Sequence, residues 1–284
     1  MFDKQLLAGK RVLITGGGTG LGKSIGARYV ELGADLYICG RRQAVLDAAA
    51  RDLAASRDGA KVRGLVCDVR DSGAVAAMMD AIWADGPLDI LINNAAGNFV
   101  AQTHRLSPRA IDAVLNVVLH GAAYCTVEAG RRWIDAGRGG VVLSVLTVSS
   151  LMGSAFTTPS AMAKAGVLSM TRSLAVEWGR KGIRLVAVAP GPFPTEGAWK
   201  QLFPDEDSVD PIETSVPLAR TGTHDELANL CAFLASDGAA FITGECVVID
   251  GGKQWLGGGT PAKAMLDWSD EQWERLRRAR AKDA

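Results

Sequence analysis

Short apolar runs recur along this chain, and most are followed by a stretch with the spacing of an amphipathic helix. The runs are rich in Val, Ile and Leu, which is typical of strands buried on both faces of a parallel sheet. Seven such runs occur, at residues 11–14, 35–39, 62–66, 90–92, 140–143, 184–188 and 246–249. This alternation predicts an α/β fold with a Rossmann-like, doubly wound, seven-stranded parallel sheet.

The length of the chain favours one domain followed by a tail. A chain of 284 residues, 48% of them hydrophobic, can bury one large core, so we expect a single domain over residues 1–256. In the tail, residues 257–284, the stretch Ser269–Gln272 has the pattern of a helix start. Because Trp268 and Trp273 are costly to leave exposed, we expect this helix to dock on the domain.

Charge and cysteine content exclude several classes of partner. Lys plus Arg and Asp plus Glu both number 31, so no global charge attracts nucleic acid or a membrane surface. The five cysteines form no CxxC pair and no cluster with the three histidines, which predicts free buried thiols and no metal site. No signal-peptide pattern and no uninterrupted run of about 20 apolar residues occurs. We therefore expect a cytoplasmic protein.

A glycine-rich turn, TGGGTGLG at residues 15–22, connects the first predicted strand to a helical stretch at 23–30. Glycines let the backbone turn sharply and approach a pyrophosphate, whose charge is then stabilised by the helix N-terminus. The strand before the turn and the helix after it make this signal specific. We expect a dinucleotide to bind at Gly16, Gly18, Thr19, Gly20, Leu21 and Gly22.

The ends of the second and third strands indicate which dinucleotide binds. An NAD site usually ends its second strand with a carboxylate, but Arg41 and Arg42 follow Gly40 here. Two guanidinium groups favour the additional phosphate of NADP, although the pair could instead be only a solvated helix start. After the third strand, Asp68 and Val69 are placed to meet the adenine.

Four motifs in this order resemble the short-chain dehydrogenase/reductase superfamily over nearly the whole chain. They are the glycine-rich turn, the Asn93–Gly97 run, Lys164 with its following Ala-Gly-Val, and the Pro190–Pro192 turn. The resemblance implies a nicotinamide-dependent oxidoreductase in which Lys164 binds the nicotinamide ribose. It also implies that further residues border the cofactor, namely Asn94, Ala95, Ala96, Pro190, Gly191, Pro192 and Phe193.

The catalytic motif of that superfamily, Tyr-x-x-x-Lys, is altered in this chain. Ser160 lies four residues before Lys164, Thr147 occupies the position of the usual serine, and Val118 that of the usual helix asparagine. An aliphatic hydroxyl is a far poorer acid than a phenol, so ordinary ketone reduction is disfavoured. Reducing a conjugated carbon–carbon double bond is less demanding, because the carbonyl oxygen then needs only hydrogen-bond stabilisation.

One branch of the superfamily, the 2,4-dienoyl-CoA reductases, is similar in detail at residues 94–99, 159–164, 175–179 and 190–192. That resemblance implies NADPH-dependent reduction of 2,4-dienoyl-CoA to 3-enoyl-CoA in unsaturated fatty acid β-oxidation. Asn98 would donate to the thioester oxygen. The other residues implied at the acyl-CoA are Phe99, Ser107, Arg41 and Arg70.

The proton donor and the substrate class remain open at this point. Some members of the branch place a tyrosine where this chain has Ser149. Ser149, Thr147, Ser160 and an ordered water are therefore all candidates. Two alternatives also remain: another short-chain enzyme acting on a carbonyl, alcohol or acyl substrate, and a dinucleotide-binding module without catalytic activity.

The predicted helices at 111–135 and 160–181 carry more apolar surface than one sheet face needs. Together with the family resemblance, this predicts a homotetramer or homodimer.

Overall fold

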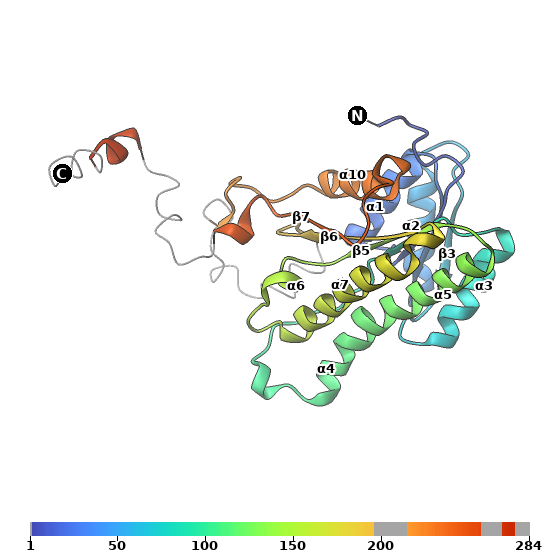
Figure 1. Ribbon diagram of the computed structural model, residues 1–284, viewed down its shortest axis with the longest axis horizontal. Helices are drawn as coiled ribbons and strands as arrows, with labels where there is room; N and C mark the ends of the chain where they lie inside the picture. The colour runs from blue at the N-terminus through green and yellow to red at the C-terminus, as the bar shows by residue number, and fades with distance from the viewer. Residues whose placement is uncertain (1, 196–214, 257–268, 276–284) are drawn as a thin grey trace.

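The computed structural model describes residues 2–195, 215–256 and 269–275. Its centre is a seven-stranded sheet in the order β3-β2-β1-β4-β5-β6-β7, and every neighbouring pair is parallel (Figure 1). The prediction of a doubly wound parallel sheet is confirmed. The strands are β1 (Arg11–Thr15), β2 (Asp35–Gly40), β3 (Val62–Val66), β4 (Ile90–Asn93), β5 (Gly140–Val145), β6 (Ile183–Pro190) and β7 (Cys246–Ile249).

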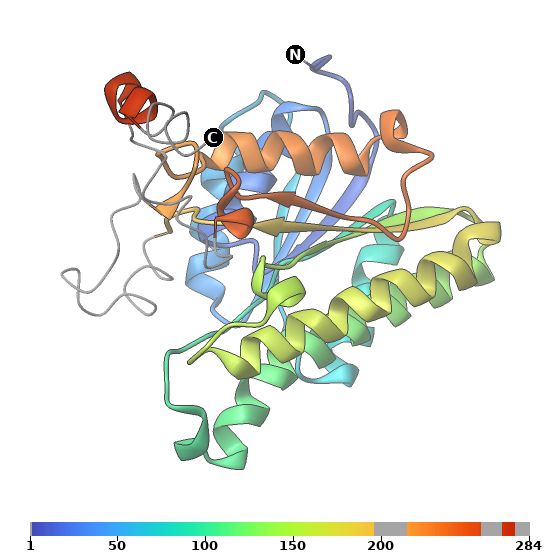
Figure 2. The same cartoon turned by 60° about the vertical axis from the view of Figure 1, so that its left-hand side comes forward.

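Helices cover both faces of the sheet (Figure 2). One face packs against α1 (Gly20–Glu31), α2 (Gln43–Ala54) and α10 (His224–Ala235). The other packs against α3 (Ser72–Asp85), α5 (Gly121–Asp135) and α7 (Thr158–Trp178). The core therefore has two apolar layers, one on each side of strands that are themselves almost entirely apolar.

The long helix predicted over residues 111–135 begins earlier, at Pro108, because Ser107 caps it by accepting from Ala110 N at 3.2 Å. It runs through α4 (Pro108–Leu115) and a π-helical segment, Asn116–His120, into α5. By length and apolar content it could cross a membrane. Core helices pass the same test, and here Cys125 and Trp133 pack into the sheet layer.

The order of the strands indicates at which edge of the sheet a ligand would bind. The order reverses between β1 and β4, whose following segments diverge to opposite sides of the sheet. In open parallel sheets such a reversal leaves a crevice at the carboxyl ends of the strands, where ligands bind. The segments after β1, β2, β3 and β4 all meet at this edge.

The tail contains a helical turn at residues 270–275, where the sequence predicts a helix. Trp273 keeps 45% of its surface exposed. Docking of the tail stays a prediction, because Trp268 lies outside the described residues.

Candidate active site

The glycine-rich turn is fastened to the end of β4 by a side chain that the sequence reasoning did not single out. The hydroxyl of Thr15, 2% exposed, accepts from the backbone N–H groups of Asn94 and Ala95, both at 3.0 Å. The Asn94 amide donates in return to Thr15 O at 3.0 Å and Gly16 O at 3.2 Å. Asn94 therefore holds the glycine-rich turn in place against the end of β4.

Two glycines of the turn adopt backbone angles that favour glycine, with φ of +65° at Gly16 and +52° at Gly20. At Gly22 the constraint is space, since a Cβ there would lie 2.4 Å from Asn94 Nδ2 and 2.6 Å from Gly16 O. The turn is thus a close backbone cradle at the N-terminus of α1. Such a cradle suits a pyrophosphate.

A cavity of about 460 Å³ opens at this edge of the sheet. It brings together predicted residues from four separate segments, whereas the predicted catalytic residues Lys164, Ser160, Thr147 and Ser149 are not among its lining residues. Its lining includes Gly16, Gly18 and Thr19, Arg41 and Arg42, Asp68, Val69 and Arg70, and Ala95, Ala96, Asn98 and Phe99. Val114 and Val117 of the long helix, which the sequence reasoning did not predict, complete the wall. The glycine turn and the two exposed arginines at this cavity suit the phosphate groups of a dinucleotide.

The basic rim of the cavity contains an internal ion pair. Arg70 Nε and Nη2 donate to both carboxylate oxygens of Asp68, at 2.9 and 2.5 Å, and this hydrogen bonding lowers the pKa of Asp68. Two residues predicted to meet ligand groups therefore bind each other. Arg41 and Arg42 are exposed on the same rim. Arg42 is also the N-cap of α2, so the helix-start interpretation describes its backbone correctly.

Lys164 lies on α7, 8% exposed, with its ammonium directed at the carboxyl end of β5, where it donates to Val145 O. Burial lowers the pKa of Lys164 to about 8. Ser160, 7% exposed, lies four residues earlier and so on the same side of the helix.

The hydroxyl groups after β5 form a pair. Thr147 Oγ1 and Ser149 Oγ are 3.0 Å apart, and Ser149 N donates to Thr147 Oγ1 at 3.2 Å. Ser149 opens α6 (Ser149–Met152). Either hydroxyl can therefore donate a hydrogen bond to the other, which a proton relay would require.

No phenol replaces the missing tyrosine within the described part of the chain. Tyr29 OH donates to Cys231 O at 2.8 Å inside the core, and Tyr37 OH donates to Asp85 at 2.7 Å. Tyr124 lies on α5 and packs against the apolar layer. Val118, at the usual asparagine position, is 2% exposed and packs with Val114 and Ala163.

Asn98 has a defined orientation. Its Oδ1 accepts from Phe99 N at 2.9 Å, and since a backbone N–H can only donate, Nδ2 is left as a donor. Phe99 lines the cavity and also packs against the Val118 cluster. Ser107 does not line the cavity among the described residues; its hydroxyl caps α4.

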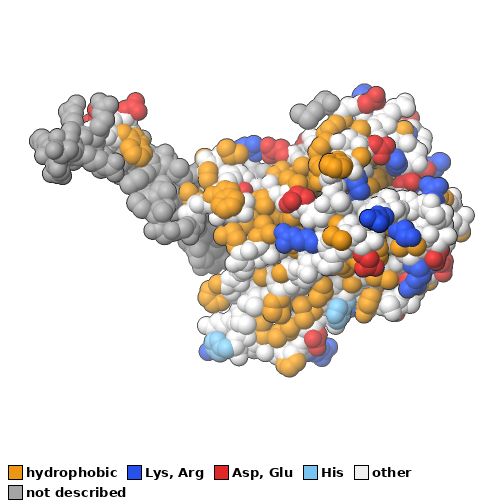
Figure 3. All heavy atoms as spheres, in the orientation of Figure 1, with side chains coloured by type: hydrophobic (Ala, Val, Ile, Leu, Met, Phe, Trp, Pro, Cys, Tyr) orange, Lys and Arg blue, Asp and Glu red, His pale blue; other side chains and the backbone are white. Residues whose placement is uncertain are grey.

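Two contacts hold the segment that follows Asn98. Ala101 N donates to Phe156 O at 2.9 Å, and the hydroxyls of Thr103 and Thr158 are 2.9 Å apart. The segment after Asn98 is thereby joined to the segment between α6 and α7. Exposed hydrophobic side chains gather over α6 and the start of α7 (Figure 3), contributed by Leu151, Met152, Phe156 and Met162.

The Pro190–Phe193 loop follows β6. A Cβ at Gly191 would lie 2.6 Å from Asp250 Cβ, so the loop runs close against the end of β7. Pro192 and Phe193 line a second cavity of about 70 Å³ together with Arg220 and Asp250. In this structure the two residues do not border the larger cavity.

Comparison with known proteins gives consistent relatives. The family model described as enoyl-(acyl carrier protein) reductase matches residues 16–254. An uncharacterized oxidoreductase of Caenorhabditis elegans is 45% identical over 94% of this chain and 87% of its own length. A probable 2,4-dienoyl-CoA reductase of Bacillus subtilis, named (2E)-enoyl-CoA-producing, is 43% identical over 87% of this chain and 97% of its own. A C. elegans relative named (3E)-enoyl-CoA-producing is 40% identical over 94% and 88%.

Among solved structures, a short-chain dehydrogenase from Bacillus anthracis superposes with a TM-score of 0.78 at 39% identity, covering 86% of this chain and 96% of the other. A doubly wound sheet with a glycine cradle at its switch point defines a dinucleotide-binding fold. The chain belongs to the short-chain dehydrogenase/reductase superfamily. A nicotinamide dinucleotide is the cofactor that this fold implies.

Proposed function

We propose that this protein reduces conjugated acyl-CoA thioesters with NADPH, converting 2,4-dienoyl-CoA to 3-enoyl-CoA in the β-oxidation of unsaturated fatty acids. The observation that carries the proposal is the combination of Ser160 before Lys164 with the free amide donor of Asn98 at the cavity. The relatives named 2,4-dienoyl-CoA reductase support the same substrate class.

NADPH, when bound, supplies the hydride. The cradle formed by Gly16 to Gly22 would receive its pyrophosphate, and Lys164 would donate to the nicotinamide ribose. Arg41 and Arg42, exposed at the rim, would pair with the 2′-phosphate. The absence of a carboxylate directly after β2 favours NADPH over NADH.

The protein would have to stabilise the negative charge that develops on the thioester oxygen. As hydride reaches the δ carbon, electron density moves through the diene to that oxygen, and Asn98 Nδ2–H would donate to it there. Protonation at the α carbon then completes the 3-enoyl product. The Thr147–Ser149 hydroxyl pair would orient the water that delivers this proton.

Two surfaces beside the cavity suit the rest of an acyl-CoA. Arg70 uses Nε and Nη2 for Asp68, so Nη1 can still pair with a CoA phosphate, next to Arg41. Phe99 and the exposed apolar side chains of α6 would border the acyl chain. Ser107 stays in this proposal only as a neighbour of that chain.

The proposal is tested with a 2,4-dienoyl-CoA and NADPH deuterated at the transferred position. We expect deuterium at the δ carbon and a 3-enoyl-CoA product by NMR and mass spectrometry. A 3-ketoacyl-CoA supplied in parallel should be reduced far more slowly, because a phenolic acid is lacking. Reduction of the ketone without reduction of the diene would overturn the proposal, and a 2-enoyl product would refute the assigned protonation site.

A further inference from the structure

The loop after β6 reaches the glycine-rich turn. Its residue Thr195 lies over Gly20, where an added Cβ would be 3.5 Å from Thr195 Cγ2. Under the proposed function, the Pro190–Phe193 part of this loop would lie beside the nicotinamide. One loop would then lie over the glycine-rich turn and border the reactive end of the cofactor.

A histidine fastens this loop to α1. His224 is the first residue of α10, is half-buried, and has both ring nitrogens engaged. Its Nε2 is 2.8 Å from Pro194 O, and its Nδ1 is 2.7 Å from Ser24 Oγ, 200 residues away in the sequence. α1 and α10 lie side by side in both ribbon views (Figures 1 and 2).

The proton positions follow from the partners. A carbonyl oxygen can only accept, so Nε2 carries the hydrogen directed at Pro194 O. In the neutral imidazole Nδ1 then accepts the single hydroxyl hydrogen of Ser24, a residue of α1. The hydrogen bonds of His224 thus join the loop to α1.

We propose that His224 is a positioning residue that holds the Pro190–Thr195 loop against the glycine-rich turn and thereby fixes the nicotinamide end of the bound cofactor. It acts through Pro194 and Ser24. The start of α10 does not need the imidazole, because Thr223 and Glu226 form a capping box there and Arg220 pairs with Glu226.

The position permits a variant that removes the imidazole and keeps the helix. His224→Pro suits the first helical residue, whose N–H has no intrahelical acceptor, and Thr223 already has the extended backbone (φ −87°, ψ 149°) that precedes proline. His224→Gln keeps a donor near the place of Nε2 and serves as partial rescue. Asn229→Ala is the matched control, because Asn229 Oδ1 accepts from Arg28 Nε at 2.8 Å and so ties α10 to α1 away from the loop.

The experiment measures the affinity of the full chain for two ligands by calorimetry. NADPH spans the whole site, whereas adenosine 2′,5′-bisphosphate lacks the nicotinamide half. His224→Pro should weaken NADPH binding roughly three- to tenfold, the change expected from one net hydrogen bond, and leave the bisphosphate unaffected. Amide hydrogen exchange within residues 190–195 should accelerate in His224→Pro, less so in His224→Gln, and not in Asn229→Ala.

Equal weakening of both ligands would show a general disturbance of α1 and overturn the proposal. Unchanged NADPH binding and unchanged exchange in His224→Pro would overturn it as well, as would the same effects in Asn229→Ala. No acyl-CoA enters the experiment, so the result is independent of the proposed substrate. NADH and ADP give the same comparison if the protein prefers NAD.

Discussion

At the scale of single residues, Lys164 carries a conflict between burial and charge. The residue is 8% exposed, and its ammonium donates to Val145 O. Burial penalises the charged form, which lowers the pKa from 10.5 to about 8. Keeping this side chain charged in the folded protein therefore costs stability near neutral pH.

This conflict predicts the stability of Lys164→Met. Between pH 8 and 10.5 the unfolded chain holds a proton that folded Lys164 has released, so this residue makes stability rise with pH. Below pH 8 the penalty is fully present and amounts to at most about 3 kcal/mol. We expect Lys164→Met to be more stable than the parent at pH 7, with the difference vanishing above pH 10.5. Urea unfolding of both proteins across this pH range measures the difference in their free energies of unfolding. A difference that is the same at every pH would contradict the prediction.

Asn98→Ala tests the assigned oxyanion donor. Because Asn98 Oδ1 accepts from Phe99 N, Asn98 Nδ2 is the amide group that can donate to the thioester oxygen. Loss of this donor should lower kcat for dienoyl-CoA on the order of 10²-fold. NADPH affinity should change little. Ser160→Ala should retain much more activity, because the aliphatic hydroxyl is a poor acid. Stopped-flow measurement of hydride transfer gives the rates of the two variants. A slower rate in Ser160→Ala than in Asn98→Ala would contradict the roles assigned to these residues.

Arg41→Ala tests the cofactor preference. Arg41 is exposed at the cavity rim, and a guanidinium–phosphate contact there would favour NADPH over NADH. The variant should narrow the difference in binding free energy by roughly 1–3 kcal/mol, with NADH affinity almost unchanged. Equal affinity of the parent protein for both cofactors would refute the preference.

At the scale of elements, the connection between β1 and α1 depends on backbone approach. A Cβ at Gly22 would meet Asn94 Nδ2 at 2.4 Å and Gly16 O at 2.6 Å, and neither can withdraw without opening the turn. We expect Gly22→Ala to weaken dinucleotide binding at least tenfold, which corresponds to about 1.4 kcal/mol.

Gly26→Ala, one turn further along α1, is the control for that experiment. Its added Cβ would lie 3.1 Å from the flexible end of Leu36, which can shift. This variant should keep its affinity for the dinucleotide. If both variants lost affinity equally, helix packing rather than the turn would be responsible.

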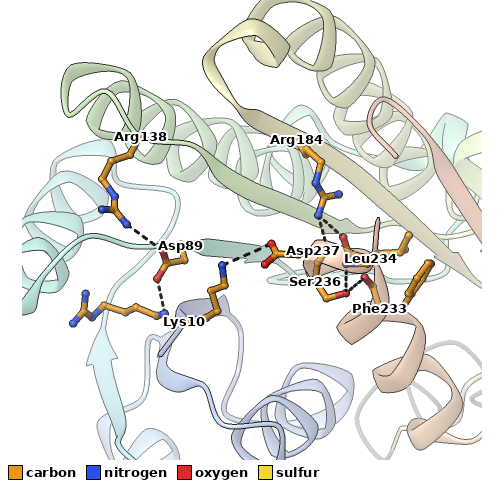
Figure 4. A network of polar contacts seen from close by, with 10 residues as sticks. Lys10, Asp89, Arg138, Arg184, Phe233, Leu234, Ser236 and Asp237 are labelled. Carbon is orange, nitrogen blue, oxygen red and sulfur yellow. Dashed lines mark hydrogen bonds and ion pairs between the residues drawn. The ribbon is translucent and has the colours of Figure 1, made fainter. Parts of the chain in front are cut away.

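At the scale of the whole molecule, a polar network joins distant segments at the amino-terminal edge of the sheet (Figure 4). Arg184, at the start of β6, donates to the carbonyls of Ile242 and Leu234 at 3.0 Å and of Ser236 at 3.1 Å. It therefore satisfies the C-terminal end of α10 and fixes where that helix stops relative to the sheet.

Arg184→Met should destabilise the protein by about 2–4 kcal/mol, because three carbonyls lose a charged donor. Arg138→Met is the comparison on the same edge. Arg138 is half exposed and 3.4 Å from Asp89, and breaking such a pair should cost less than about 1 kcal/mol. Chemical denaturation measures the loss of unfolding free energy in each variant. Equal losses in Arg184→Met and Arg138→Met would contradict the assigned role of Arg184.

The class of fold, the seven strands and the glycine-rich cradle could all be predicted from the amino-acid sequence. These features follow from local physics, since apolar periodicity and a strand–glycine–helix pattern are written in neighbouring residues. The altered catalytic motif was readable for the same reason, because Ser160 and Lys164 lie one helical turn apart. The helix start was misplaced by three residues, because the cap at Ser107 was not recognised.

Which groups from distant segments pair with one another could be seen only in the folded protein. Val118 became part of an apolar cluster, and the ring of His224 joined Ser24 across 200 residues. Hydrogen-bond and ion-pair partners depend on distances of a few ångströms between separate segments. Those distances exist only once the sheet has brought the segments together.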